Sequence, residues 1–97
     1  MTTKKTPIKT IKNDNVEEKI KSTLKKAREE GDAYTIAGLM IDAFGVKERD
    51  IHNKSFSDWP KGLPTMYTRI RVTLEKLVNE DRVIKEKYGK AYHYWWK

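Results

Sequence analysis

Apolar residues recur at helical spacing in three stretches of this chain. The first stretch has four of them, at intervals of four, four and three residues: Val16, Ile20, Leu24 and Ala27. This spacing puts the four side chains on one face of a helix, which can then pack against a core. Asp14 or Asn15 can cap the start of the helix, and Gly31 can end it.

The second stretch follows Tyr34, where the pattern predicts a short strand segment. Its apolar residues fall at positions i, i+3, i+4, i+7 and i+8: Ile36, Leu39, Met40, Ala43 and Phe44. Thr35 can cap this helix and Gly45 can end it. Gly38 in its interior costs about 1 kcal/mol relative to alanine, which predicts close packing against a neighbouring group.

The third stretch predicts a helix from Pro64 to Val78. Its apolar stripe again has intervals of four, four and three residues: Met66, Ile70, Leu74 and Leu77. At about 100° per residue, the side opposite this stripe carries Thr65, Thr68, Val72, Lys76 and Asn79. Arg69 and Arg71 flank the stripe on either side, and Glu75 is expected on the outer face, where it would repel phosphate.

Residues 46–64 show no clear period and predict a loop of 19 residues, with a turn or two of helix after Val46. Phe56, Trp59 and Leu63 are expected to anchor it. Anchored loops of this length are often functional, but the favoured interpretation is a structural insertion whose aromatic rings fill the core.

Residues 82–88 and 91–96 predict a β-hairpin, because the dipeptide Gly89-Lys90 between them suits a type II′ turn. The resulting register makes four pairs: Ile84 with Trp95, Lys85 with Tyr94, Glu86 with His93, and Lys87 with Tyr92. Alternation then groups both lysines and both tyrosines on one face. Trp95 is expected to complete the core, and Trp96 to be available for an interface.

Charge supports an anionic partner. The 97 residues carry 21 lysines and arginines against 14 acidic residues, a formal charge of +7. The excess lies at the two ends, with +3 over residues 1–14 and +4 over residues 65–97. Such an excess attracts polyanions. Residues 1–13 predict a disordered basic arm and residues 14–97 a single folded domain.

The totals also limit the class of protein. No stretch approaches the roughly 18 consecutive apolar residues of a membrane span. The chain has no cysteine, so disulfides and thiol zinc sites are excluded, and a cytoplasmic protein is expected.

The predicted order is helix, short strand, helix, loop, helix and hairpin, which is a mainly α fold with a small β-hairpin (α+β). Over residues 15–96 this order resembles the winged helix-turn-helix superfamily. Residues 70–85 look like the end of a recognition helix and the first wing strand, and residues 34–39 look like the start of the helix before the turn. Two features depart from the pattern: the long segment 46–64 replaces a tight turn, and Asp81 stands where glycine is common.

The resemblance implies three helices and a C-terminal wing in a small DNA-binding protein, a transcriptional regulator. Duplex DNA would be held by helix 65–79 and wing 82–96, with bases read from the start of the helix. The expected DNA contacts are Thr65, Thr68, Arg69, Arg71, Val72, Lys76, Lys85, Lys87 and Lys90. Either arginine can donate paired hydrogen bonds to guanine or phosphate, although Arg71 could instead pair with Glu75.

Two other functions stay open. A protein-interaction module would use Trp59, Val72 and Trp96, and an RNA binder would stack bases on Tyr92 and Tyr94. Homodimer formation is also open. His52 and His93 lie apart without metal-site spacing, and the glycines are too scattered for a phosphate loop. Neither an enzyme nor a cofactor or metal is therefore expected.

Overall fold

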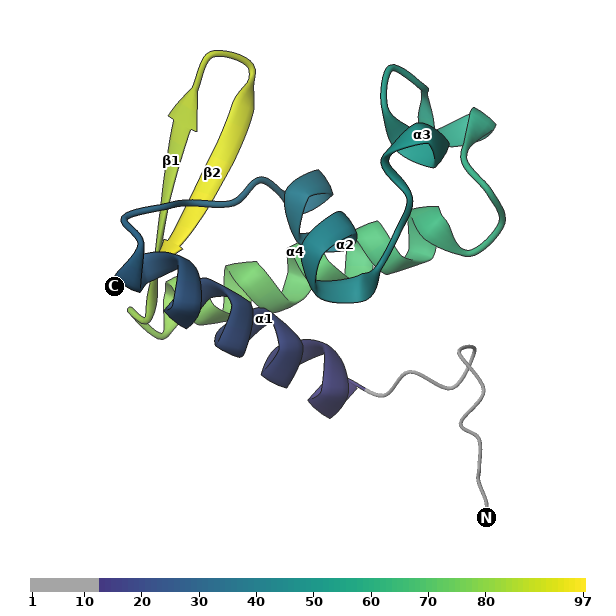
Figure 1. Cartoon of the computed structure of the whole chain (residues 1–97). Helices are drawn as coiled ribbons and strands as arrows, with labels where there is room; N and C mark the ends of the chain where they lie inside the picture. The colour runs from purple at the N-terminus through teal and green to yellow at the C-terminus, as the bar shows by residue number, and fades with distance from the viewer. Residues whose placement is uncertain (1–12) are drawn as a thin grey trace.

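The structure is a computed structural model that describes residues 13–97. Its elements are α1 (Asn13–Glu29), α2 (Ile36–Phe44), α3 (Glu48–Ile51), a 3-10 turn η2 (Phe56–Asp58), α4 (Leu63–Asn79), β1 (Val83–Tyr88) and β2 (Ala91–Trp96). In Figure 1 the hairpin projects from one end of the helices, and α3 with the following turn projects from the other. The predicted fold class, mainly α with a C-terminal hairpin, is confirmed, and the arrangement is winged-helix-like. Residues 1–12 of the predicted arm lie outside the described residues.

The apolar pattern of the first two helices is as predicted, but α1 begins at Asn13, so the cap expected at Asp14 or Asn15 was wrong. All four apolar positions of α1 are buried. Beyond its end, Gly31 has a left-handed φ of 76°, and the Asp32 N–H donates to the Ala27 carbonyl at 2.8 Å, which closes the last turn as a Schellman motif. In α2 the Thr35 hydroxyl accepts from the Gly38 N–H at 3.0 Å, so the predicted cap is confirmed.

The predicted strand segment at Tyr34 is a β-bridge to the wing. The Tyr34 N–H donates to the Tyr94 carbonyl at 2.8 Å, and the Tyr94 N–H returns the bond at 2.7 Å. Close packing at Gly38 is confirmed as well, because a Cβ there would lie 3.0 Å from Cδ1 of Tyr34. The bridge ties the base of the wing to the start of α2.

The core lies where α1, α2 and α4 meet the base of the wing. Its buried members are Val16, Ile20, Leu24, Ile36, Leu39, Met40, Ile51, Ile70, Leu74, Leu77, Val83 and Tyr94. The α4 stripe contributes three residues that are fully buried. The wing contributes Tyr94, whose side chain is 2% exposed, so the hairpin is part of the core.

The hairpin has the predicted register, from Ile84 opposite Trp95 to Lys87 opposite Tyr92. Gly89 supplies the positive φ of 64° that the turn requires. The roles expected of the two tryptophans were wrong. Trp96 packs against the core, on the same strand face as the buried Tyr94. Trp95 points to the opposite face, where it lines a surface hollow with Tyr88.

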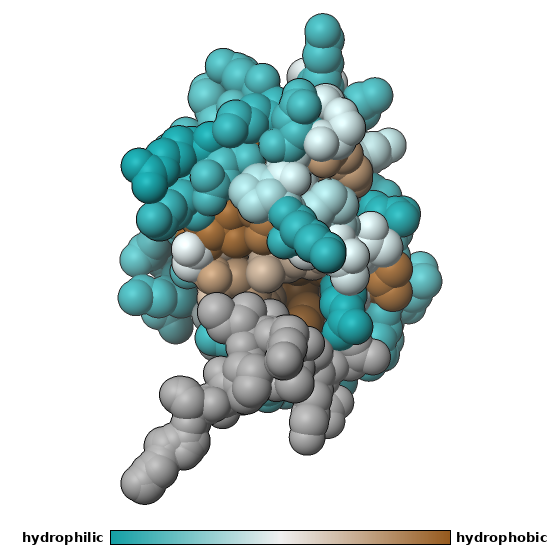
Figure 2. All heavy atoms as spheres, turned by 90° about the vertical axis from the view of Figure 1, so that its right-hand side faces the viewer, coloured by the Kyte–Doolittle hydropathy of each residue, from teal (hydrophilic) through white to brown (hydrophobic). Residues whose placement is uncertain are grey.

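The segment between α2 and α4 is more structured than the predicted loop. It contains the η2 turn as well as α3, which confirms the helical turn expected after Val46, and α4 begins at Leu63, one residue before the expected start at Pro64. Trp59 and Leu63 pack against the core as expected. The expectation that Phe56 is an anchor was wrong, because its side chain is 46% exposed. Figure 2 views this end of the molecule, where polar side chains cover most of the surface and hydrophobic ones gather near the centre.

Candidate nucleic-acid interface

One side of α4 faces solvent because the opposite stripe is held in the core. The exposed side chains include five of the predicted DNA contacts: Thr65, Thr68, Arg69, Val72 and Lys76. We call these five residues the outer face of α4. Val72 is 57% exposed, an apolar group among polar neighbours. The predicted polar face is therefore confirmed as a solvent-exposed side of α4.

Local contacts hold the side chains of Thr68 and Lys76. The Thr68 hydroxyl donates to the Pro64 carbonyl one turn earlier, at 3.1 Å, which fixes its orientation. Lys76 Nζ lies 2.8 Å from a Glu17 carboxylate oxygen on α1. The hydrogen bond from Lys76, followed by that from Lys21, lowers the pKa of Glu17. Lys76 thus reaches a phosphate only by leaving an ion pair.

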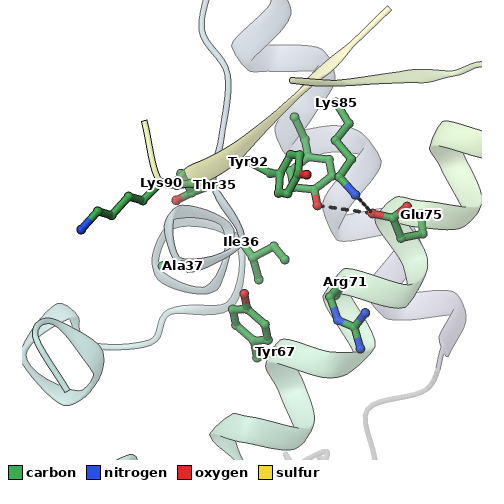
Figure 3. A pocket seen from close by; sticks show the side chains of 11 residues that line it. Thr35, Ile36, Ala37, Tyr67, Arg71, Glu75, Lys85, Lys90 and Tyr92 are labelled. Atoms are coloured by element: carbon green, nitrogen blue, oxygen red, sulfur yellow. Dashed lines mark hydrogen bonds and ion pairs between the residues drawn. The ribbon is translucent and has the colours of Figure 1, made fainter. Parts of the chain in front are cut away.

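A groove of about 700 Å³ lies between the start of α2, the middle of α4 and the hairpin. We call it the wing groove. Its lining comprises Thr35, Ile36, Ala37, Tyr67, Arg71, Glu75, Lys85, Lys90, Ala91, Tyr92 and Tyr94. Figure 3 shows these side chains arriving from all three elements, with Lys90 extending outward. The groove therefore collects three of the predicted DNA contacts and has a net positive lining.

The helical period alone predicted Glu75 on the outer face of α4, and this prediction was wrong. The Glu75 side chain is turned into the wing groove, and Oε2 lies 2.7 Å from Nζ of Lys85 (Figure 3). That hydrogen bond raises the pKa of Lys85. The sequence had left open a pairing of Glu75 with Arg71. In the structure Glu75 pairs with Lys85, which joins α4 to the wing. The ammonium group of Lys85 offsets the negative charge of the Glu75 carboxylate, so Glu75 repels phosphate less than an unpaired carboxylate would.

The predicted grouping of lysines and tyrosines on one strand face is confirmed. Lys85 Nζ lies 4.3 Å from the centroid of the Tyr92 ring, and Lys87 Nζ lies 5.9 Å from it. Tyr94 belongs to the same face but is buried, and burial raises the pKa of its phenol. Its hydroxyl lies 3.4 Å from Glu75 Oε2. On this face Tyr94 is thus part of the core, whereas Lys87 and Tyr92, which lie nearer the turn, are exposed to solvent.

Six of the nine predicted contacts lie at two separate sites. Arg71, Lys85 and Lys90 line the wing groove. A smaller hollow of about 310 Å³ at the start of α4 is lined by Phe56, Pro64, Thr65, Thr68 and Arg69, and we call it the Phe56 hollow. Val72, Lys76 and Lys87 line neither.

The residues of these sites that sequence reasoning missed include Thr35, Tyr67 and Phe56. Thr35 was recognised as a helix cap, yet nothing in the sequence placed α2 beside the wing. Tyr67 follows Met66 at the edge of the apolar stripe, which gave no sign of a groove residue. Phe56 was assigned to the core because large aromatic residues are usually buried.

Within residues 13–97, no cluster of three or more histidine, cysteine or acidic side chains could hold a metal ion. Over the same residues, no helix is long and apolar enough to cross a membrane. Comparison with protein-family models, with curated proteins and with solved structures finds no match to this chain.

Proposed function

We propose that this chain binds duplex DNA, as a transcriptional regulator would, with the outer face of α4 in the major groove and the wing against the backbone. The observation that carries the proposal is the wing groove, where Arg71, Lys85 and Lys90 are gathered beside that face. A phosphate backbone that follows the groove would hold α4 next to the base edges. Phosphate contacts fix register in this way, and base contacts supply specificity.

The dimensions of α4 suit this arrangement. A helix with its side chains is about 10–12 Å across, and the major groove of B-DNA is about 12 Å wide. The outer face offers hydroxyls, a guanidinium and the exposed Val72. Hydroxyl and guanidinium groups can bond to base edges, and an aliphatic side chain can contact a thymine methyl. This mixture favours base reading over a purely electrostatic contact.

The start of α2 adds a further attraction for phosphate. Thr35, Ile36 and Ala37 line the wing groove; Thr35 is the cap of α2, and Ile36 and Ala37 begin its first turn. The first N–H groups of a helix lack partners within it, and the helix dipole places partial positive charge there. A phosphate between this turn and Arg71 would meet donors from both sides.

The structure gives less support to the other two functions, RNA binding and protein interaction. An RNA binder would have stacked bases on Tyr92 and Tyr94, but Tyr94 is buried and Lys85 lies over the Tyr92 ring. A protein-interaction module would have used Trp59, Val72 and Trp96. Both tryptophan rings pack against the core, which leaves Val72 as the exposed member of that set.

Fluorescence anisotropy with a labelled duplex, repeated over a range of salt concentrations, tests the proposal. We expect Arg71→Ala and Lys90→Ala each to lower the log–log salt slope by about 0.9, the value for one phosphate contact. Lys26→Ala is the matched control, because Lys26 lines a separate hollow beside Tyr34. No binding at low salt would refute the proposal. Equal losses in all three variants would mean that binding follows net charge and does not use the wing groove.

A further inference from the structure

The insertion between α2 and α4 holds an aromatic ring in solvent. Phe56 is 46% exposed, although burying such a ring would normally stabilise the fold. Its centroid lies 4.6 Å from that of Trp59 and 4.8 Å from that of Tyr67. The Trp59 indole N–H donates to the Lys54 carbonyl at 3.2 Å. The exposed ring is therefore supported by two others, both of which pack against the core.

The position of this ring connects the insertion to α4. Phe56 forms one wall of the Phe56 hollow, and the other walls come from the first turns of α4, including Thr65, Thr68 and Arg69. Among the described residues, the other large hydrophobic side chains with marked exposure are Val72, Tyr88 and Tyr92. Phe56 and Val72 thus bring apolar surface to the same helix, at its start and on its outer face.

We infer that Phe56 is part of the DNA-reading surface, and that its ring contacts the methyl group of a thymine held at the Phe56 hollow. This inference rests on the proposed function, since it names a base contact of the same interface. The thymine C5-methyl is the apolar group that a base presents in the major groove. A hollow that combines one exposed ring, two threonines and Arg69 matches a methyl group flanked by polar base edges and phosphate.

The insertion is then part of the interface. It replaces a tight turn with a segment that supports Phe56 beside the start of α4, so the protein contacts base pairs beyond the reach of the helix alone. The cationic Arg69 in the hollow favours DNA over an apolar protein segment, because burying its charge against such a segment would be costly.

The test uses a preferred duplex selected from a random-sequence pool with the full chain. Each thymine of that duplex is then replaced by uracil, which removes the methyl group and leaves the hydrogen-bonding groups intact. At one position we expect wild-type affinity to fall about three- to fivefold, the effect of exposing one methyl group. Phe56→Ala should show no such penalty at that position, and Phe56→Leu, which keeps an apolar side chain, should retain part of it.

The outcomes separate the two proposals. If Phe56→Ala binds duplex DNA but shows the wild-type uracil penalty at every position, the inference is wrong and the proposed function survives. If selection recovers no bound duplex, both are wrong. Thermal unfolding checks that Phe56→Ala is folded, and Phe56→Leu provides the same comparison with less disturbance to the rings of Trp59 and Tyr67.

Discussion

Replacing Glu75 by glutamine should strengthen DNA binding, although Glu75 stabilises the protein. The carboxylate holds Lys85 at 2.7 Å, with side-chain exposures of 28% for Lys85 and 37% for Glu75. An ion pair this accessible contributes no more than about 1 kcal/mol to stability. Glu75→Gln should therefore fold normally, with a small loss of stability, while releasing the Lys85 ammonium into the wing groove.

The effect on DNA binding follows from the added phosphate contact. One more neutralised phosphate raises the log–log salt slope by about 0.9, so the advantage of the variant should shrink by about three- to fourfold between about 50 mM and about 200 mM salt. The same anisotropy titrations measure this dependence. The double variant Glu75→Gln/Lys85→Ala should lose the added slope, because the released cation is then absent.

Glu86→Gln provides the control for net charge. It removes one negative charge from an exposed position on the hairpin, where Glu86 accepts a hydrogen bond from Tyr88 at 2.7 Å. It releases no lysine. If Glu75→Gln and Glu86→Gln increase the slope equally, release of Lys85 is not the cause. If Glu75→Gln leaves the slope unchanged, release of Lys85 adds no phosphate contact to those of the wild type.

Two further predictions concern stability. Asp81 has a left-handed φ of 65°, and its ion pair with Lys97 at 2.6 Å is largely exposed. Asp81→Gly should therefore stabilise the fold by about 0.5–1 kcal/mol in chemical denaturation. A loss of stability would mean that the ion pair contributes more than the backbone strain costs. The hydrogen bond to Asp42 raises the pKa of Tyr34 from 10.0 to about 12, so the neutral phenol contributes fully below pH 10 and its contribution is lost as pH rises from about 10 to 12. After allowance for solvent screening at this partly exposed site, that loss should be about 1 kcal/mol, and Tyr34→Phe should lack it; parallel losses in both proteins would contradict the assignment.

Local rules predicted the elements of this fold because each depends on neighbours in sequence. The helical stripes ending at Ala27 and Leu77 needed a period alone. The caps at Thr35 and Gly45 needed a side-chain oxygen and a left-handed residue at the right place. The hairpin register followed from Gly89-Lys90, since a two-residue turn fixes every pair above it.

The failures have a common physical origin in tertiary placement. A register specifies which residues share a strand face, but not which face meets the core, so Trp95 and Trp96 were exchanged. A helical period gives only the direction of a side chain around the helix axis, so it placed Glu75 on the outer face. The ion pair with Lys85 of the wing turns that side chain into the wing groove. Phe56 was assigned to the core by its size, and support from neighbouring rings was not visible in the sequence.

The same distinction decides which substitutions can report on function. Tyr94 links the wing to the fold twice, by burial and by its backbone bridge to Tyr34. Any change at Tyr94 would disturb the angle between hairpin and helix, and a loss of DNA binding there would not identify a contact. Arg71, Lys90 and Phe56 are exposed side chains at the surface of the same frame. Removing any of these side chains can change binding while the core and the packing of the wing stay intact. Effects at these three positions therefore separate a loss of DNA recognition from a loss of structure.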